Sequence, residues 1–323
     1  EALGLGRSNL IYASGGVFFL LAPNTKAAQS QLDKFHGKFN SWLFENFGTS
    51  LYLCLATEEL SGSDLMGKEG HLQGAWSSLG GKLRLQKDRK WESFILEDPE
   101  GFMHPKPVEK ECQICHQGRG VESRNFDGTS LELCDFCSTM IRLGQHLPDV
   151  NIFYETKQTT ATSPLSISIC DLHYHFSNEP YKGVSAAYQL KNPWDLPESD
   201  YPIRPFPSGS YYTESEFDKL ASTAVGDKKI GVVRMDVDRL GQIFSRGLQD
   251  ATFARMSDLS ARLNQYFKYY LPKLLARSET YSFLPLEPRK MPINVIYAGG
   301  DDLFLVGTWD ATIEMACAIN HDF

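Results

Sequence analysis

One eight-residue segment, 297–304, constrains this chain more than any other feature of its 323 residues. It reads Tyr-Ala-Gly-Gly-Asp-Asp-Leu-Phe and joins two apolar runs, Ile293 to Ala298 and Leu303 to Val306. Adjacent glycines suit a tight turn because they reach positive φ angles that other residues resist. Carboxylates held on one turn can share divalent cations such as Mg²⁺ or Mn²⁺. The segment therefore predicts a β-hairpin whose tip carries Gly299, Gly300, Asp301 and Asp302.

A second acidic element lies upstream of this hairpin. An apolar run that starts at Ile230 ends in Asp236 and Asp238. In a strand, period-two alternation places Arg234, Asp236 and Asp238 on one face. Pairing of this strand with the hairpin brings Asp236 beside the two acids of the hairpin. Such a cluster can hold two metal ions around a transferring phosphoryl group.

A helix is expected between the two acidic elements. Apolar residues recur three or four positions apart, which is the helical period: Leu259, Leu263, Tyr266, Phe267, Tyr270 and Leu274. A strand, a helix and an acidic hairpin in this order are typical of the palm domain of nucleotidyl transferases and nucleotide cyclases. The alternative is an ordinary solvated turn that follows an ordinary strand end. In the catalytic interpretation, the catalytic residues and metal ligands are Asp236, Asp301 and Asp302.

The start of the chain contains an echo of the acidic hairpin. Residues 11–21 are identical to residues 296–306 at six of eleven positions, but Gly16 and Val17 replace the two acids. A second, degenerate palm explains the echo, and chance similarity between two hairpins is the alternative. We expect backbone donors at the first turn to hold the phosphates of one nucleotide. The residues expected to bind nucleotide are Ser14, Gly15, Gly16, Gly299, Gly300 and Asp238.

Four cysteines form the other strong signal. Cys112 and Cys115 make one Cys-x₂-Cys pair, and after eighteen residues Cys134 and Cys137 make another. This spacing predicts two knuckles that place four thiolates around a structural Zn²⁺. Two disulfides are the alternative, which suits an oxidising compartment better. The other cysteines lie in apolar runs and are expected to be buried free thiols: Cys54, Cys170 and Cys317.

The composition is that of a folded soluble protein, with 42% hydrophobic residues and a formal net charge of −8. The acidic balance argues against broad nonspecific binding to nucleic acid. No apolar stretch approaches the roughly twenty residues that span a bilayer. No signal-peptide pattern opens the chain. We therefore expect a cytoplasmic protein that does not contact the membrane.

These signals predict an α+β fold, in which two ferredoxin-like palm domains are joined by a four-cysteine zinc-ribbon insert. Residues 1–100 are expected to form the degenerate palm, 101–215 the zinc ribbon and a linker, and 216–323 the catalytic palm. Prolines between positions 193 and 207 predict that the linker crosses the surface. Both palms look incomplete, the first at its start and the second at its end. Strand-like runs are expected in the middle region at 152–156, 166–176 and 185–190.

The arrangement as a whole resembles the large catalytic subunit of type III CRISPR effector complexes, in which two palms flank a four-cysteine ribbon and only the second bears Gly-Gly-Asp-Asp. Three segments are more similar to the Csm branch, subtype III-A, than to the Cmr branch: residues 12–24, 205–212 and 234–241. The resemblance covers nearly the whole chain.

This resemblance implies that ATP is converted to cyclic oligoadenylates when the guide RNA of the complex pairs with a target RNA. Asp301 and Asp302 match the family's metal-binding pair, and Asp236 matches the strand carboxylate of related cyclases. The implied partners are ATP, guide RNA, target RNA and the other subunits of the type III-A complex. Family members commonly add an N-terminal HD nuclease domain that cuts single-stranded DNA, and the sequence shows no such domain.

Two rival functions stay open. A diguanylate cyclase shares the palm, but its hairpin usually reads Gly-Gly-Asp/Glu-Glu-Phe, whereas here Asp302 and Leu303 replace Glu-Phe. A noncatalytic scaffold of an RNA-guided complex would carry vestigial acids. The scaffold predicts no metal-dependent nucleotide turnover, and the enzyme predicts turnover that is lost when Asp301 and Asp302 become alanine.

Overall fold

The computed structural model describes residues 3–14, 16–66, 71–103, 108–126, 128–157, 165–191, 196, 198–238, 240, 243, 252–276, 290–300 and 302–323. The strands are β1 Leu10–Ser14, β2 Val17–Leu20, β3 Val121–Phe126, β4 Thr129–Cys134, β5 Ile152–Thr156, β6 Ser166–Ile169, β7 Leu172–Phe176, β8 Ala186–Gln189, β9 Ile203–Pro205, β10 Ile230–Asp236, β11 Ile293–Gly299 and β12 Asp302–Thr308. The helices are α1 Lys26–Phe47, α2 Gly62–Leu65, α3 His71–Asp88, α4 Glu92–Glu97, α5 Pro99–Met103, α6 Asp135–His146, α7 Phe217–Ser222, α9 Phe253–Gln265, α10 Leu271–Ala276 and α11 Trp309–Asp322.

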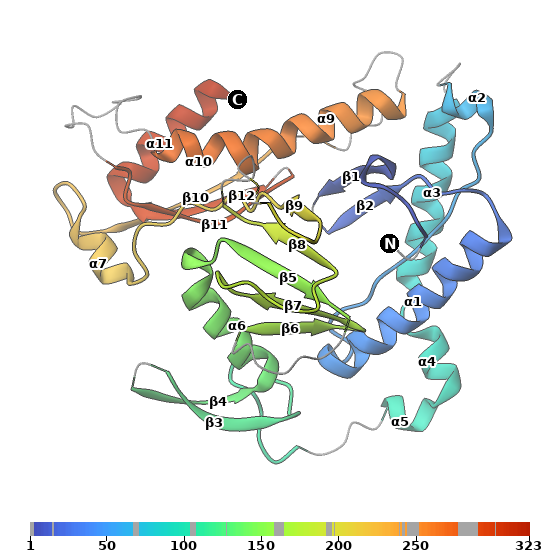
Figure 1. The fold of residues 1–323 in the computed structure, drawn as a ribbon, viewed down its shortest axis with the longest axis horizontal. Coiled ribbons are helices and arrows are strands. Elements are labelled where there is room, and N and C mark those ends of the chain that lie inside the picture. Colours follow the sequence, from blue (N-terminus) through green and yellow to red (C-terminus); the bar gives the residue numbers. More distant parts are fainter. Residues whose placement is uncertain are drawn as a thin grey trace.

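The C-terminal part is an antiparallel sheet with strand order β10-β12-β11. Helices α9, α10 and α11 lie along one side of it (Figure 1), and a π-helical turn, Tyr266–Tyr270, joins α9 to α10. Leu303 and Leu305 of the central strand are fully buried in the core beneath these helices. Along β10 the side chains alternate, so that Val233 packs against the core while its neighbours point to the exposed face. The predicted strand, helix and hairpin are confirmed.

The N-terminal hairpin, β1 with β2, has the same strand register as the acidic hairpin, β11 with β12. In both, the tyrosine of the shared sequence lies opposite a phenylalanine, two residues separate the paired strands, and the pairing shifts at the isoleucine before the tyrosine. The matching pairs are Tyr12 with Phe19 and Tyr297 with Phe304, then Ser14 with Val17 and Gly299 with Asp302. The sequence echo therefore corresponds to a repeated backbone arrangement.

Helix α9 packs against both hairpins. At its N-terminal end, Met256 is buried with Ile11 of β1 and Leu72 of α3. At its C-terminal end, Leu263 belongs to the core of the three-stranded sheet, against which Tyr12 of β1 also packs. One helix thus contributes to two hydrophobic clusters, and Figure 1 shows β1 and β2 below its N-terminal part.

The middle of the chain forms a five-stranded sheet with strand order β6-β7-β5-β8-β9. The predicted strand run 166–176 is two strands that pair as a hairpin. The proline-rich segment was expected to be a linker only, but Ile203–Pro205 forms an edge strand parallel to β8. An edge position suits proline because its missing N–H would otherwise interrupt the hydrogen bonds of a central strand.

Candidate functional site

The acidic site is built by the register of three strands. Asp302 is the first residue of the central strand β12, and its partners are Asp236 at the end of β10 and Gly299 at the end of β11. Directly opposite residues of antiparallel strands point to the same face, with Cβ atoms about 4.5–5.5 Å apart. The sequence prediction that Asp236 lies beside an acid of the hairpin is therefore met at Asp302. Asp301 lies outside the described residues.

The chemistry of this pair fits a divalent cation. Like charges directly opposite each other on a sheet are destabilising, and a bound cation reverses that effect. Oxygen ligands from carboxylates are those that Mg²⁺ prefers, and Mn²⁺ accepts them too. Asp236 is exposed and Asp302 is half-buried, so a metal bound by them would remain accessible to a nucleotide.

The other residues expected to bind nucleotide differ in their positions: some lie in the hairpin turns, and others lie at or beyond the end of a strand. Gly300 occupies the turn of the acidic hairpin at a φ of 67°, where glycine is favoured. Gly16 has a φ of 75° in the turn of the first hairpin, while Gly15 lies outside the described residues. Ser14 ends β1. Asp238 lies two residues beyond β10 and is exposed, so it is not part of the paired strands.

A pocket of about 250 Å³ opens beside Asp302 on the exposed face of the sheet. Its lining includes Arg234 of β10, Tyr297 of β11 and Phe304 of β12. A guanidinium group suits phosphate, and aromatic rings suit a nucleobase. Sequence reasoning placed Arg234 on the acidic face but gave it no role. The two aromatic residues were missed because only the register of three strands shows that they share this face.

The four cysteines of the second predicted site come together. Their sulfur atoms all lie within 4.8 Å of one another, and all four are free thiols. The Sγ atoms of Cys115 and Cys134 are 3.7 Å apart. Zn–S bonds of about 2.3 Å in a tetrahedron put sulfur atoms ~3.8 Å apart. The arrangement therefore fits a structural Zn²⁺ and is too open for disulfide bonds.

The second cysteine pair differs from the expected knuckle because it lies at a junction between a strand and a helix. Cys134 ends β4 and caps α6, and its Sγ accepts a hydrogen bond of 3.4 Å from the backbone N–H of Cys137. The positive end of a helix dipole favours thiolates. Burial raises the pKa of Cys137. Burial also acts to raise the pKa of Cys112, but backbone N–H groups lower it to about 6.

The other cysteines differ from the expectation of burial. Cys317 is exposed, and Cys54 and Cys170 are half-buried. Apolar neighbours in the sequence do not by themselves place a thiol in the core. Cys317, for example, lies on α11 but not on the buried face of that helix.

No described helix is long and apolar enough to cross a membrane.

Two models of known protein families match this chain, one at each end. The family model described as Csm1 subunit domain B matches residues 1–105, and the one described as Cas10/Cmr2, second palm domain, matches residues 229–323. The second match begins just before β10 and includes the acidic site. Residues 229–323 are thus similar to a palm domain.

A curated relative from Enterococcus italicus is the CRISPR system single-strand-specific deoxyribonuclease Cas10/Csm1 of subtype III-A. It is 28% identical over 99% of this chain and 41% of its own length. The chain therefore spans about two fifths of the length of this relative.

Two crystal structures of Csm1-Csm4 cassettes share the fold. The one in complex with one ATP has a TM-score of 0.75 at 24% identity, over 98% of this chain and 40% of that chain. The one in complex with cA4 has a TM-score of 0.72 at 24% identity, with the same coverage. Likeness at this level of identity shows the fold alone.

Proposed function

We propose a function from one premise: this chain belongs to the Cas10/Csm1 family of subtype III-A CRISPR systems, and residues 229–323 match the model of the family's second palm domain. The proposed activity is the joining of ATP molecules into cyclic oligoadenylates, switched on when target RNA binds the assembled complex. The observation that carries this proposal is the strand register that sets Asp236 opposite Asp302. Structural neighbours in complex with ATP and with cA4 support the choice of substrate and product class.

In this proposal Asp236, Asp302 and the neighbouring Asp301 hold the divalent cations. Mg²⁺ or Mn²⁺ held by these carboxylates would supply the positive charge that activates the 3′-hydroxyl of one ATP for attack on the α-phosphate of the other and that stabilises the leaving pyrophosphate. Arg234 lies on the same exposed face and would bind a phosphate oxygen. Tyr297 and Phe304 line the same pocket and would contact the base or ribose.

The first hairpin has the backbone of the acidic one but carries Val17 where the acidic one has Asp302. We propose that residues 1–100 are a degenerate palm that binds a second nucleotide through backbone groups of Ser14, Gly15 and Gly16. Residues 101–215 would hold a structural Zn²⁺, and residues 216–323 would be catalytic. The proposed partners are a Csm4-like subunit, guide RNA and target RNA. Single-stranded DNA would be the substrate of a nuclease domain elsewhere in the full-length protein.

The test uses the full effector complex with Mg²⁺ or Mn²⁺, matched target RNA and ATP, and identifies products by mass spectrometry. We expect cyclic oligoadenylates from the wild type and a loss of about 100-fold or more in the variant with Asp301→Ala and Asp302→Ala, because metal stabilisation of the transition state is removed. Asp258→Asn is the matched control. Its carboxylate lies in an exposed ion pair with Arg262 on α9, and its loss should leave the rate unchanged.

The same experiment separates the rival functions. Assembly without any nucleotide product, in the presence of bound target RNA, would support the noncatalytic scaffold. A cyclic dinucleotide made from GTP in a parallel reaction would support a diguanylate cyclase instead.

A further inference from the structure

Residues 206–214, the strap, form neither a helix nor a strand, but they connect the two larger sheets of the molecule. The strap continues directly from β9, and the backbone N–H of Phe206 donates to Gln189 O at the end of β8 at 2.8 Å. At the other end, the backbone N–H of Thr213 donates to Oδ1 of Asn294 in β11 at 2.8 Å. The strap therefore joins the five-stranded sheet to the sheet that carries the acidic site.

Hydrogen bonds fix the strap to the first half of β11. The backbone N–H of Val295 donates to Tyr211 O at 2.8 Å, and the Tyr211 ring packs against the core of the three-stranded sheet. Asn294 is 3% exposed, and its side-chain amide donates to Glu214 O at 2.6 Å while its Oδ1 accepts from Thr213. Buried polar groups that are satisfied in this way make a segment rigid. The strap is thus bound to β11 along the edge that β12 does not occupy.

Gly209 is where the strap contacts the end of β11 that leads into the acidic turn. It is buried and has a φ of 67°, which glycine adopts readily and other residues resist. A Cβ atom at this position would lie 3.1 Å from the Cβ of Ala298, 3.2 Å from Phe267 O and 3.3 Å from Ala298 O. These distances are shorter than the roughly 3.5–4.0 Å of optimal contact. A side chain here would therefore push the strap, the π-helical turn and the end of β11 apart.

The contact at Ala298 lies one residue from the acidic site. Gly299, the next residue, pairs with Asp302. Asp302 pairs in turn with Asp236. The register of β11 shifts just after Val295, and irregularities of this kind bend a strand and are common beside active sites. The strap holds β11 on both sides of the shift, by the hydrogen bond at Val295 and by the close contact at Ala298.

We propose that the strap positions the acidic hairpin and that Gly209 is the positioning residue through which it acts. This inference rests on the proposed function, in which the acids of the hairpin hold the divalent cations. Loss of a group that orients metal ligands typically costs about 10–100-fold in metal affinity or activity. Because the strap starts at β8 and β9, the five-stranded sheet becomes the support on which the geometry of the acidic hairpin depends.

The test measures Mn²⁺ binding to the full-length protein that contains this chain by electron paramagnetic resonance. Subtraction of the binding that remains in the variant with Asp301→Ala and Asp302→Ala isolates the acidic site from other Mn²⁺ sites. We expect Gly209→Ala to weaken Mn²⁺ binding at this site about tenfold, because the new Cβ displaces Ala298. In the full effector complex, excess Mn²⁺ should recover much of the lost rate of ATP turnover, which an unfolded variant could not do.

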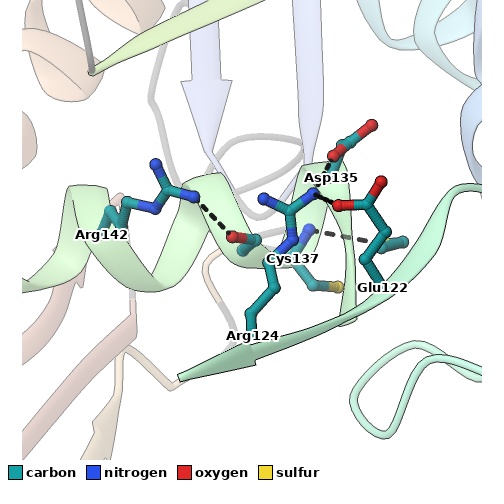
Figure 2. Close-up of polar contacts among 7 residues, drawn as sticks. Glu122, Arg124, Asp135, Cys137 and Arg142 are labelled. Atoms are coloured by element: carbon teal, nitrogen blue, oxygen red, sulfur yellow. Dashed lines mark hydrogen bonds and ion pairs between the residues drawn. The ribbon is translucent and has the colours of Figure 1, made fainter. Parts of the chain in front are cut away.

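Gly226→Ala is the matched control. Gly226 lies shortly before β10 at a φ of 71°, but a Cβ there would meet no atom of the described residues within 4 Å. It reproduces the backbone strain without the contact and should bind Mn²⁺ as the wild type does. Arg124→Gln controls for disturbance elsewhere in the middle of the chain. Figure 2 shows Arg124 with Glu122 and Asp135, and these contacts lie in the four-cysteine module and not in the strap.

A compensating change separates the contact from the strain. Ala298→Gly removes the Cβ that the new side chain would meet, so Gly209→Ala should weaken Mn²⁺ binding less in that background than in the wild type. The proposal is wrong if Gly209→Ala binds Mn²⁺ as the wild type does, if either control weakens binding equally, or if the effect of Gly209→Ala is the same in both backgrounds.

A milder variant decides the question if Gly209→Ala does not fold. Thr213→Val keeps Gly209 but removes the hydroxyl that donates to Ile293 O at 3.2 Å, and loss of one hydrogen bond to the strap should weaken Mn²⁺ binding about threefold. Unchanged binding in Thr213→Val would then overturn the proposal. A wild type that binds Mn²⁺ at the acidic site but forms no cyclic product would count against the proposed synthesis and not against the strap. Absence of acid-dependent Mn²⁺ binding in the wild type would overturn both.

Discussion

Asp236 and Asp302 face each other across neighbouring strands, and without a cation their charges oppose pairing of these strands. We therefore expect Asp236→Asn to have opposite effects on stability and on activity. In EDTA the variant should be more stable than the wild type, by roughly 0.5 kcal/mol. With Mg²⁺ or Mn²⁺ the wild type should gain stability through binding and the variant should gain less.

Thermal unfolding with and without the metal measures both effects, and cyclic oligoadenylate formation by the full complex should fall in Asp236→Asn. Asp258→Asn is the control, because its carboxylate lies on α9 in an exposed ion pair with Arg262. Equal metal-dependent stabilisation of the wild type and Asp236→Asn would contradict the assignment of Asp236 as a ligand.

At the scale of the element, the junction of β4 and α6 combines a helix cap with a candidate metal ligand at Cys134. Serine is a good N-cap but a poor substitute for a thiolate on zinc. We expect Cys134→Ser to keep the cap and still to lose most of the zinc, from about one ion per chain. Metal analysis of the purified protein measures this, with Cys317→Ser as the control because Cys317 is exposed and outside the cluster. Zinc content that is unaffected in Cys134→Ser would contradict the four-cysteine site.

Elements with a strong local pattern could be predicted from the sequence. Residues 259–274 have helical periodicity, and they form α9, the π-helical turn and α10. The sequence placed Asp236 beside the acids of the hairpin only on the condition that the two elements pair, and the register that sets it opposite Asp302 is seen in the structure. By contrast, β9 is stabilised by its parallel partner β8 rather than by its own sequence, so its prolines predicted only a linker. The pocket of Arg234, Tyr297 and Phe304 depends on the register of three strands, which no local pattern encodes.

At the scale of the whole molecule, α9 connects the two hairpins through separate clusters at its two ends. Met256 is 1% exposed in the cluster with β1. Met256→Ala should therefore leave a cavity and destabilise the protein by about 2–5 kcal/mol. Hydrogen exchange should show the largest loss of protection in β1 and β2, before the three-stranded sheet opens.

Met103→Ala is the matched control, because Met103 is 67% exposed and exposed substitutions change stability by less than about 0.5 kcal/mol. If protection were lost equally in β1 and in β12, the two clusters would unfold as one unit and α9 would not be a connection between separable parts.

The shared register of the two hairpins has a consequence for the direction of the proposed reaction. The backbones around Ser14 and Gly299 are alike, yet only the second is followed by acids. A pair of identical hairpins would let two bound nucleotides exchange the roles of nucleophile and leaving-group donor. Here Val17 stands where the second hairpin has Asp302, and this difference removes the symmetry within a single chain. In the proposed reaction each nucleotide would therefore keep one role, and the oligonucleotide would grow from one end only.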